Sequence, residues 1–273
     1  MKVAVFTIKG GVGKTAIILG IGLAASLIYN KKVLLVDTDL QADLSYRILG
    51  DAVALYSVFS NEKYGIAKFA SIPNAEPKPV QLFDNLYLIP MEHDAFMNVD
   101  QQTIMRKISD LPDDYDLILI DTPPSFDRNS ALELISNVDA IFTVVAPAYP
   151  SIRITNAELR FIIPMIIEKV RNTPYFVGII KNNIYSTVSE QIQSAIFSLN
   201  DICTGEMRKV PHYTPCIFSN EVKRKAAIFN YNRFAYNIRT KNTKTIKIDL
   251  AATNIAGVTE EFLKRLEEGV KHE

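Results

Sequence analysis

The stretch Lys9-Gly10-Gly11-Val12-Gly13-Lys14-Thr15 decides the fold of this chain. It directly follows the apolar run 3–6 and precedes the apolar, glycine-punctuated segment 16–25. Glycines let successive backbone N–H groups turn inward onto an anion, and a strand, a glycine-rich turn, Gly-Lys-Thr and a helix are the parts of a phosphate-binding loop. The general pattern has a glycine where Ile8 stands, but it is otherwise met. The stretch therefore predicts a nucleoside triphosphate site between a strand and a buried helix.

Two side chains of this loop have roles set by the general pattern. Lys14 is expected to reach the β- and γ-phosphates, and the Thr15 hydroxyl is expected to ligate Mg²⁺. The N-terminus of the helix that follows adds its dipole to the same site. An ordinary glycine-rich turn, the alternative, rarely combines this order of residues with a flanking strand and helix.

The bulk composition is that of a large globular protein. The 273 residues are 48% hydrophobic and have a formal net charge of zero, so an electrostatic partner must be met by a local patch. Cys203 and Cys216 match neither a disulfide framework nor a zinc pattern. Because residues 1–8 already read as the first strand, we expect no signal peptide. The longest apolar stretch, 16–29, is too short to span a bilayer. We expect one domain over residues 1–273 in a cytoplasmic protein.

Short apolar runs alternate with helical patterns along the chain. Near-continuous apolar runs of this kind are typical of parallel strands that are buried on both faces. Helical patterns at 154–170, where Pro164 predicts a kink, and at 188–199 separate two of them. The order predicts an α/β fold with a doubly wound, mainly parallel sheet, helices on both faces and ligands at the carboxyl ends of the strands. After the first strand, the predicted strands are 33–36, 86–89, 117–120, 140–145 and 175–180.

Carboxylates follow two of these predicted strands. Asp37 and Asp39 close the strand 33–36, and Asp121 closes the strand 117–120. In a parallel sheet they emerge at the edge that holds the phosphate loop, where Mg²⁺ needs hard oxygen ligands and the attacking water needs a group to orient it. Capping of a turn is the alternative for either position alone. Their joint presence behind a phosphate loop favours the nucleotide site.

Three segments together resemble the ParA/MinD family of deviant Walker-A ATPases. They are the loop 9–15, Val36-Asp37-Thr38-Asp39-Leu40-Gln41, and Ile120-Asp121-Thr122-Pro123-Pro124, and their order and spacing agree with the nucleotide motifs of that family. The similarity extends at least through Asn182. The resemblance implies a P-loop NTPase fold, an ATP-sandwich homodimer, and ATP with Mg²⁺ as ligands.

The resemblance also implies a role for each motif residue. Lys9 would be the deviant lysine that reaches the partner subunit's phosphates, whereas Lys14 and Thr15 would hold phosphate and Mg²⁺ within the same subunit. Asp39 would position the hydrolytic water. Asp37 and Asp121 would lie at the Mg²⁺ shell, the latter in the switch loop.

The nucleotide-contacting set that the resemblance implies is longer. Asn182 falls where family members often place the residue that reads adenine, with Asn183 as a close competitor and an ordinary turn asparagine as the alternative. The full set is Lys9, Gly10, Gly11, Val12, Gly13, Lys14, Thr15, Ala16 and Asn182.

Two positions depart from the family pattern. Ala16 stands where a second hydroxyl usually follows Lys-Thr, which removes one hydrogen bond to the α-phosphate, a loss of about 1 kcal/mol. The frequent Asp-Pro-Gln is Asp39-Leu40-Gln41 here, which keeps the acid but leaves the loop less stiff. We expect a slow ATPase that a partner stimulates, because a completing cation and a positioned water are worth ~10³–10⁵ in phosphoryl transfer.

Some branches of the family are excluded by missing residues. No cysteine flanks Asp121 and no Cys-x-x-Cys occurs, which argues against the iron–sulfur branches. The predicted terminal helix 257–270 has an apolar stripe at Val258, Phe262, Leu266 and Val270. Its charged residues are mostly acidic, so we expect it to pack on the core and not on a membrane.

The C-terminal part, residues 203–273, contains a basic segment at 223–247. That segment has eight Lys and Arg residues, no Asp or Glu, and several interleaved aromatic residues. A solvated face is the alternative, but such a local field favours contact with phosphate backbones without sequence readout. The expected contacts with nonspecific double-stranded DNA are Lys223, Arg224, Lys225, Arg233, Arg239 and Lys241, which Arg208 and Lys209 extend.

The resemblance and the basic segment together predict a DNA-partition ATPase of the ParA (Soj-like) type. Because the phosphate loop begins at residue 9, we expect no N-terminal helix-turn-helix domain. The resemblance implies a nucleoid-associated homodimer that is released from DNA when a ParB-like centromere-binding protein stimulates hydrolysis. Two other classes stay open: a MinD-like positioning ATPase acting on a protein or membrane surface, and a small-molecule ligase or synthetase that uses the same loop.

Overall fold

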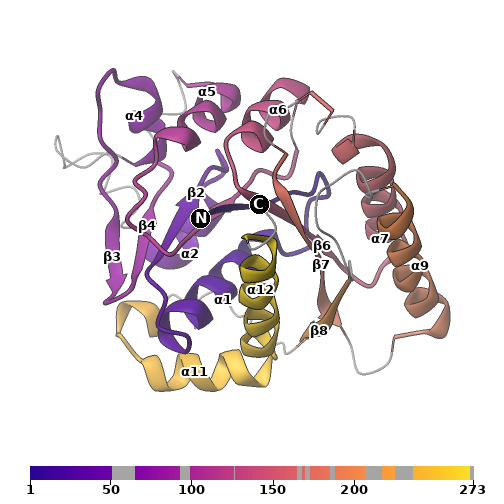
Figure 1. The fold of residues 1–273 in the computed structure, drawn as a ribbon. Helices are drawn as coiled ribbons and strands as arrows, with labels where there is room; N and C mark the ends of the chain where they lie inside the picture. The colour runs from indigo at the N-terminus through magenta and orange to yellow at the C-terminus, as the bar shows by residue number, and fades with distance from the viewer. Residues whose placement is uncertain are drawn as a thin grey trace.

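A computed structural model describes residues 1–50, 65–92, 99–125, 127–164, 168–169, 173–184, 188–206, 217–224 and 236–270. Its centre is an eight-stranded sheet in the order β3-β4-β2-β5-β1-β6-β7-β8, seen edge to edge in Figure 1. Every neighbouring pair is parallel except β3 and β4. The strands are β1 (Lys2–Val5), β2 (Val33–Asp37), β3 (Val80–Phe83), β4 (Leu86–Ile89), β5 (Leu117–Asp121), β6 (Ala140–Val145), β7 (Tyr175–Ile184) and β8 (Ile217–Lys223). The predicted doubly wound, mainly parallel α/β fold is confirmed.

The two strands that the apolar pattern missed lie at the edges of the sheet. β3 pairs antiparallel with β4, and only its second half is buried. β8 contains the polar run Ser219-Asn220-Glu221 and pairs only with β7 among the described strands. Edge strands are half-solvated, so they lack the continuous apolar character by which the inner strands are recognised.

Helices cover both faces of the sheet (Figure 1). One buried cluster lies under α1 (Lys14–Leu27), α2 (Asp43–Leu49), α11 (Thr243–Ala252) and α12 (Ile255–Val270). A second cluster fills the opposite face. Its covering elements are α4 (Ile66–Ser71), α5 (Gln101–Arg106), η2 (Lys107–Asp110), α6 (Arg128–Ser136), α7 (Tyr149–Ala157), η3 (Glu158–Ile162) and α9 (Glu190–Glu206).

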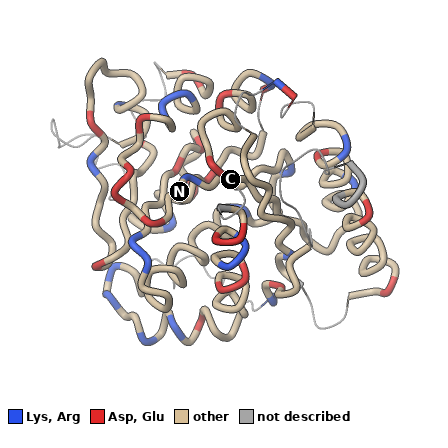
Figure 2. Tube along the Cα trace, in the orientation of Figure 1, with Lys and Arg blue, Asp and Glu red and all other residues tan. Residues whose placement is uncertain are grey.

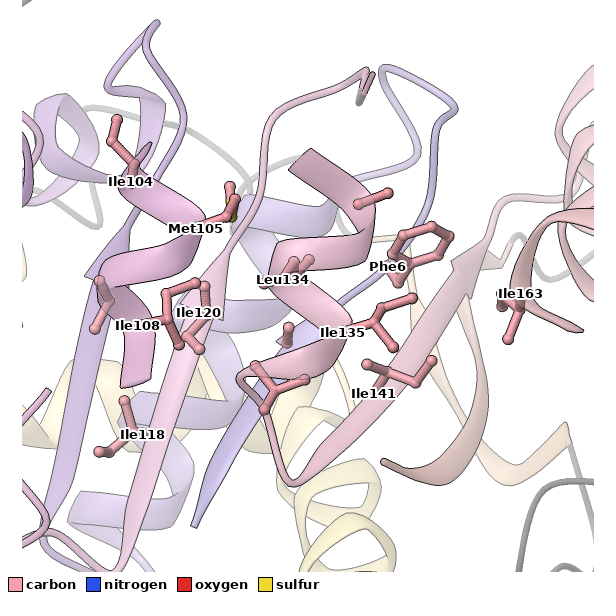
Figure 3. Close-up of a cluster of buried hydrophobic side chains, with 14 of the residues drawn as sticks. Phe6, Ile104, Met105, Ile108, Ile118, Ile120, Leu134, Ile135, Ile141 and Ile163 are labelled. Carbon is pink, nitrogen blue, oxygen red and sulfur yellow. The ribbon is translucent and has the colours of Figure 1, made fainter. Parts of the chain in front are cut away.

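The second cluster shows why the strands read as unbroken apolar runs. In Figure 3, Ile120 of β5 lies between Ile108 of η2 and Leu134 of α6, and Ile118 lies further down the same strand; all four belong to this cluster. Leu117 and Leu119, which alternate with Ile118 and Ile120 along the strand, belong to the first cluster. A strand buried on both faces must be apolar at every position, and this is what β5 shows.

The terminal helix α12 is part of the first cluster. Val258 and Phe262 are fully buried, and Leu266 is 5% exposed. The Phe262 ring meets Phe142 of β6 edge to face, with 5.3 Å between ring centroids. Val258, Phe262 and Leu266 of the predicted stripe therefore pack on the sheet. None of the helices in the described part of the chain has the length and apolar composition needed to span a bilayer.

The charged residues of α12 fasten it to edge strand β8. Glu261 accepts hydrogen bonds from the backbone N–H groups of Ser219 and Asn220, both at 2.8 Å. Arg265 donates to the carbonyl oxygens of Val177 and Ile217, at 3.0 and 3.1 Å, and to Glu261 at 2.7 Å. The hydrogen bonds from Ser219 and Asn220 lower the pKa of Glu261, against the opposing effect of its burial. Charge on this helix thus completes the hydrogen bonding of a sheet edge.

The helix predicted at 154–170 differs from the expectation. It starts earlier, at Tyr149, and it changes to a π-helical turn at Glu158–Ile162. A proline lacks an N–H and clashes with the carbonyl four residues before it, so Pro164 disfavours regular α geometry in that turn. The widened turn begins with Glu158, whose side chain contacts Thr7 and Ile8, just before the phosphate loop.

Candidate functional site

The phosphate loop joins β1 to α1 as the sequence predicts. Gly11 and Gly13 have φ angles of +77° and +93°, a left-handed conformation that glycine adopts without strain. Gly13 is the N-cap of α1 and provides no side-chain cap, so the first N–H groups of this helix face the loop. The loop and helix N-terminus together form an anion site.

Asn182 lies directly against this loop. It is 4% exposed, and its Nδ2 donates to the Val12 carbonyl oxygen at 2.7 Å. A Cβ on Gly13 would lie 2.2 Å from that Nδ2, so the close approach also requires glycine there. The Asn182 Oδ1 is buried without a hydrogen-bond partner, which leaves an acceptor for a donor group of a ligand. Asn183, the competing residue, is half-buried with φ of +61° and, with Asn182, lines a cavity beside the phosphate loop.

The carboxylates of β2 and β5 meet at the adjacent edge of the sheet. Asp37 and Asp121 are paired in register on the two strands, and both are fully buried. Asp37 accepts hydrogen bonds from the Ser45 N–H at 2.8 Å, the Ser45 hydroxyl at 2.7 Å and the Asp39 N–H at 3.1 Å. Burial raises the pKa of Asp37 to about 7 against these hydrogen bonds, because a carboxylate loses its hydration there.

Asp121 has the environment of a cation ligand. Neither of its oxygens has a hydrogen-bond partner within standard geometry, and burial together with the nearby Asp37 charge raises its pKa well above the ordinary value. Thr15 lies close enough to oppose that shift. A hard cation between Thr15 and Asp121 would offset the repulsion of the two carboxylates. No closed cage of three or more His, Cys, Asp or Glu occurs among the described residues, and Mg²⁺ commonly keeps several waters and few protein ligands.

Asp39 and Lys14 lie in the same electrostatic environment. Asp39 is 8% exposed, its Oδ1 accepts from the Gln41 N–H at 2.9 Å, and burial raises its pKa. Lys14 is 7% exposed, and its Nζ donates to the Thr7 carbonyl oxygen at 3.3 Å. Burial lowers the pKa of Lys14, opposed by Asp121, Asp39 and Glu158 in that order. Such groups gain from a ligand that carries negative phosphates and a divalent cation.

The loop after β5 packs on the phosphate loop. The Thr122 hydroxyl donates to the Val5 carbonyl oxygen at 2.7 Å, which ties this loop to the end of β1. Pro124 lies so close to Gly10 that a Cβ there would be 3.5 Å from the Pro124 Cβ. That distance is an ordinary van der Waals contact, so Pro124 lies beside the phosphate loop.

Glu158 is a site residue that the sequence reasoning missed. It is fully buried, and its Oε1 accepts from the Thr7 hydroxyl at 2.8 Å and from the Ile8 N–H at 2.6 Å. Burial raises its pKa to about 7. The general loop pattern has glycine at the position of Ile8, and here the N–H of that residue binds a carboxylate of the chain itself. A charged residue inside an apolar helical pattern was the available signal in the sequence.

The structure places the expected DNA contacts in different surroundings. Lys223 is exposed at the end of β8, whereas Arg224, the next residue, lines the cavity beside the phosphate loop. Arg239 lies over Gly50, where a Cβ would meet its guanidinium. The Lys241 ammonium donates to the Leu82 carbonyl oxygen. Lys225, Arg233, Arg208 and Lys209 lie outside the described residues.

Other basic residues of the segment 223–247 lie on α11. Lys244 and Lys247 are exposed, next to Ile248, which is 57% exposed. In Figure 2, blue segments follow each other along α11 and the turn before it, whereas α12 has red and blue together. The α11 surface is thus the part of the described C-terminal region where basic residues gather.

A cavity of about 430 Å³ adjoins the outer side of the phosphate loop. It is lined by residues of the loop, of α1, of α2 and of the ends of β7 and β8. These residues are Gly11, Val12, Gly13, Ala16, Arg47, Asn182, Asn183 and Arg224. A space beside a phosphate loop, with a buried amide oxygen at its wall, has the position and chemistry of a nucleoside pocket.

A family model described as an AAA domain matches residues 1–153, more than half of the chain. The chain belongs to this family, the ParA/MinD-like ATPases. The chromosome-partitioning ATPase Soj of Treponema pallidum (strain Nichols) is 34% identical over 126 residues, which are 43% of this chain and 46% of that protein. The virulence plasmid ParA family protein pGP5-D of Chlamydia psittaci is 31% identical over 131 residues, 46% of this chain and 49% of that protein. The chain thus spans about half the length of the curated relatives that it matches.

A solved structure of similar fold extends the likeness to nearly the whole chain. The pNOB8 ParA structure superposes with a TM-score of 0.74 at 18% identity, covering 97% of this chain and 98% of that one. The same protein bound to nonspecific DNA gives a TM-score of 0.70. At 18% identity this likeness shows a shared fold, that is, the arrangement of sheet and helices in Figure 1.

Proposed function

We propose that this protein is a partition ATPase that binds ATP with Mg²⁺, forms a homodimer around it and binds DNA nonspecifically as the dimer. The observation that supports this most directly is the convergence of Lys14, Thr15, Asp37, Asp39 and Asp121 at one sheet edge. The names of the partition-protein relatives and of the DNA-bound ParA neighbour support the choice of DNA as the surface.

The residues of this edge would divide the work of hydrolysis. The amides of the loop and of the α1 N-terminus bind phosphate oxygens, and Lys14 turns from the Thr7 carbonyl oxygen to the terminal phosphates. Thr15, Asp37 and Asp121 would hold Mg²⁺, which supplies neutralisation of the charge developing on the phosphates. Asp39 orients the attacking water, and Lys9 from the second copy completes the charge around the γ-phosphate.

DNA binding is assigned to the exposed basic residues of the C-terminal region. Lys223, Lys244 and Lys247 are exposed and can approach phosphates. Release would follow hydrolysis stimulated by a ParB-like protein, after which the dimer separates. The nucleoid would be the location of the ATP-bound form.

The test is DNA binding by wild type and Asp39→Ala with ATP, with ADP and without nucleotide, alongside sizing of each sample. We expect a DNA-bound dimer only with ATP, and a longer-lived dimer for Asp39→Ala because hydrolysis no longer ends it. A monomer with ATP in both proteins would contradict the proposal. Binding of ATP-loaded protein to anionic liposomes and not to DNA would instead favour a positioning ATPase on a membrane.

A further inference from the structure

Ala16 leaves a gap in the contacts that the phosphate loop can offer. It lies in the first turn of α1, half-buried, and its methyl group lines the cavity beside the loop. A methyl group cannot donate a hydrogen bond, so the hydroxyl that the family pattern places toward the α-phosphate is missing. Another donor at the same wall of the cavity could take over that contact.

Two arginines line this cavity with Ala16. Arg47 comes from α2, the helix that follows the Asp37–Asp39 turn, and its Nη2 lies 3.9 Å from Asp43 Oδ2. Both partners of that ion pair are partly exposed, so the pair itself is weak. An arginine presents a planar fork of donors that matches phosphate oxygens.

Arg224 reaches the same cavity because of the sheet topology. It follows directly on β8, which pairs parallel with β7, whose carboxyl end contains Asn182. Parallel strands end at the same edge of a sheet, so Arg224 lies at the nucleotide edge and not on α11. Among the described lining residues, these two arginines are the charged ones. A cavity with two cations beside a phosphate loop is suited to an anionic ligand.

We propose that Arg47 and Arg224 bind the nucleotide at its α-phosphate and ribose, in place of the hydroxyl that Ala16 lacks. This inference rests on the proposed function, because it concerns the same ATP site. It reassigns Arg224 from the expected DNA contacts to the nucleotide. Because ADP and ATP share the α-phosphate, Arg47 should contribute equally to the binding of both.

The experiment measures the Kd of a fluorescent ADP and a fluorescent ATP for wild type, Arg47→Gln, Arg224→Gln, Ala16→Ser and the double change Arg47→Gln with Ala16→Ser. We expect Arg47→Gln to weaken ADP and ATP equally, by about 10- to 100-fold, the factor for a hydrogen bond to a charged group. Adding Ala16→Ser to Arg47→Gln should lower the Kd again by about fivefold, because the serine hydroxyl restores one hydrogen bond. Arg106→Gln, at an exposed ion pair with Glu133 on α5 and α6, is the matched control and should change neither Kd.

Other outcomes separate the inference from the proposed function. Arginine variants that bind both nucleotides within twofold of wild type would overturn the inference while ATP binding stands. A wild type that binds neither nucleotide would overturn the proposed function, and the inference with it. Arg47→Lys keeps the charge but not the planar fork of donors, so it should lose less nucleotide affinity than Arg47→Gln. It replaces Arg47→Gln in the experiment if that variant does not fold. With saturating ATP, Arg224→Gln should keep the salt dependence of DNA binding, and a shallower slope would return this residue to the DNA contacts.

Discussion

The nucleotide edge and the α11 surface use charge in opposite ways. At the nucleotide edge, Asp37, Asp121 and Glu158 are fully buried and Lys14 is 7% exposed. On the α11 surface, Lys244 and Lys247 are exposed, and Figure 2 shows where basic residues lie along the helix. Interactions between buried charges are strong and depend on the exact positions of the atoms. Exposed charges are screened by water and salt, and many of them together produce the attraction to a partner.

The two regions should therefore respond differently to single substitutions and to salt. One substitution of a buried charge at the nucleotide edge removes a whole interaction, and its effect does not depend strongly on salt. One substitution on α11 removes only part of the total attraction to DNA phosphates, and added salt weakens the part that remains.

The largest effect is expected for Lys9→Ala. If Lys9 completes the charge around the partner's phosphates, its loss should slow hydrolysis by ~10³–10⁵, the worth of such a cation, with little change in nucleotide binding to the monomer. Single-turnover hydrolysis of labelled ATP, with sizing in ATP, measures both. Lys31→Ala, which removes a half-exposed lysine close to Glu267, is the control. A hydrolysis rate within tenfold of wild type would remove Lys9 from the mechanism.

Phe262→Ala tests whether the C-terminal region is held by its core and not by its charges. Phe262 is fully buried against Phe142 and Phe218, so truncation should lower the free energy of unfolding by about 3–5 kcal/mol. Urea unfolding followed by circular dichroism measures it. Ile248→Ala, at a residue that is 57% exposed on neighbouring α11, should change stability by less than about 0.5 kcal/mol. Equal losses for the two variants would contradict this account of α12.

Salt dependence tests the α11 surface. If four basic residues contact phosphates, the slope of log K against log salt should be about −3.6, a loss of roughly 150-fold between about 50 and 200 mM salt. Changing Lys244 and Lys247 together to Gln should reduce the slope to about −1.8 if both are contacts. Lys264→Gln, at an exposed lysine of α12 near Glu268, should leave the slope unchanged. DNA binding that ignores salt would mean that the α11 surface has another role.

The smallest effect is expected for the pH dependence that Glu158 adds to stability. Burial raises the folded-state pKa of this carboxyl from 4.5 to about 7, so the folded protein binds more protons than the unfolded chain between those pH values. The free energy of unfolding should therefore fall as pH rises from about 4.5 to 7 and level off above. Glu158→Gln removes this contribution, so its stability relative to wild type should rise across that window, on the order of 2 kcal/mol. Urea midpoints at pH 5 and pH 7.5 for both proteins measure the change, and a constant difference would contradict it.

Much of the nucleotide edge could be predicted because its residues are local in the sequence. The loop 9–15 contains its own turn chemistry, since Gly11 and Gly13 take the left-handed angles that their residue type permits. Asp37 and Asp121 each end an apolar run, and the register of parallel strands then brings them together. Glu158 could not be found this way, because its contacts with Thr7 and Ile8 join residues about 150 positions apart.

For the other charged residues, too, the sequence predicted where charge lies along the chain but not which groups each charge contacts. Composition identified the basic segment, yet it could not separate Arg224, at the nucleotide cavity, from Lys244 and Lys247 on an exposed helix. It also could not show that Glu261 and Arg265 complete the hydrogen bonds of a sheet edge. Charge is read from the sequence, but the partner of a charge depends on the packing of distant segments.

The sequence by itself determined that this chain forms a parallel α/β sheet with a phosphate loop and two strand-end carboxylate turns. Those properties follow from side-chain periodicity and backbone preferences that act over a few residues. Only the tertiary structure decided which charges are buried at the site, which fasten α12 to β8, and which remain on the surface. The physical reason is that burial and hydrogen bonding, which set the energy of a charge, arise only when the sheet and its helices have come together.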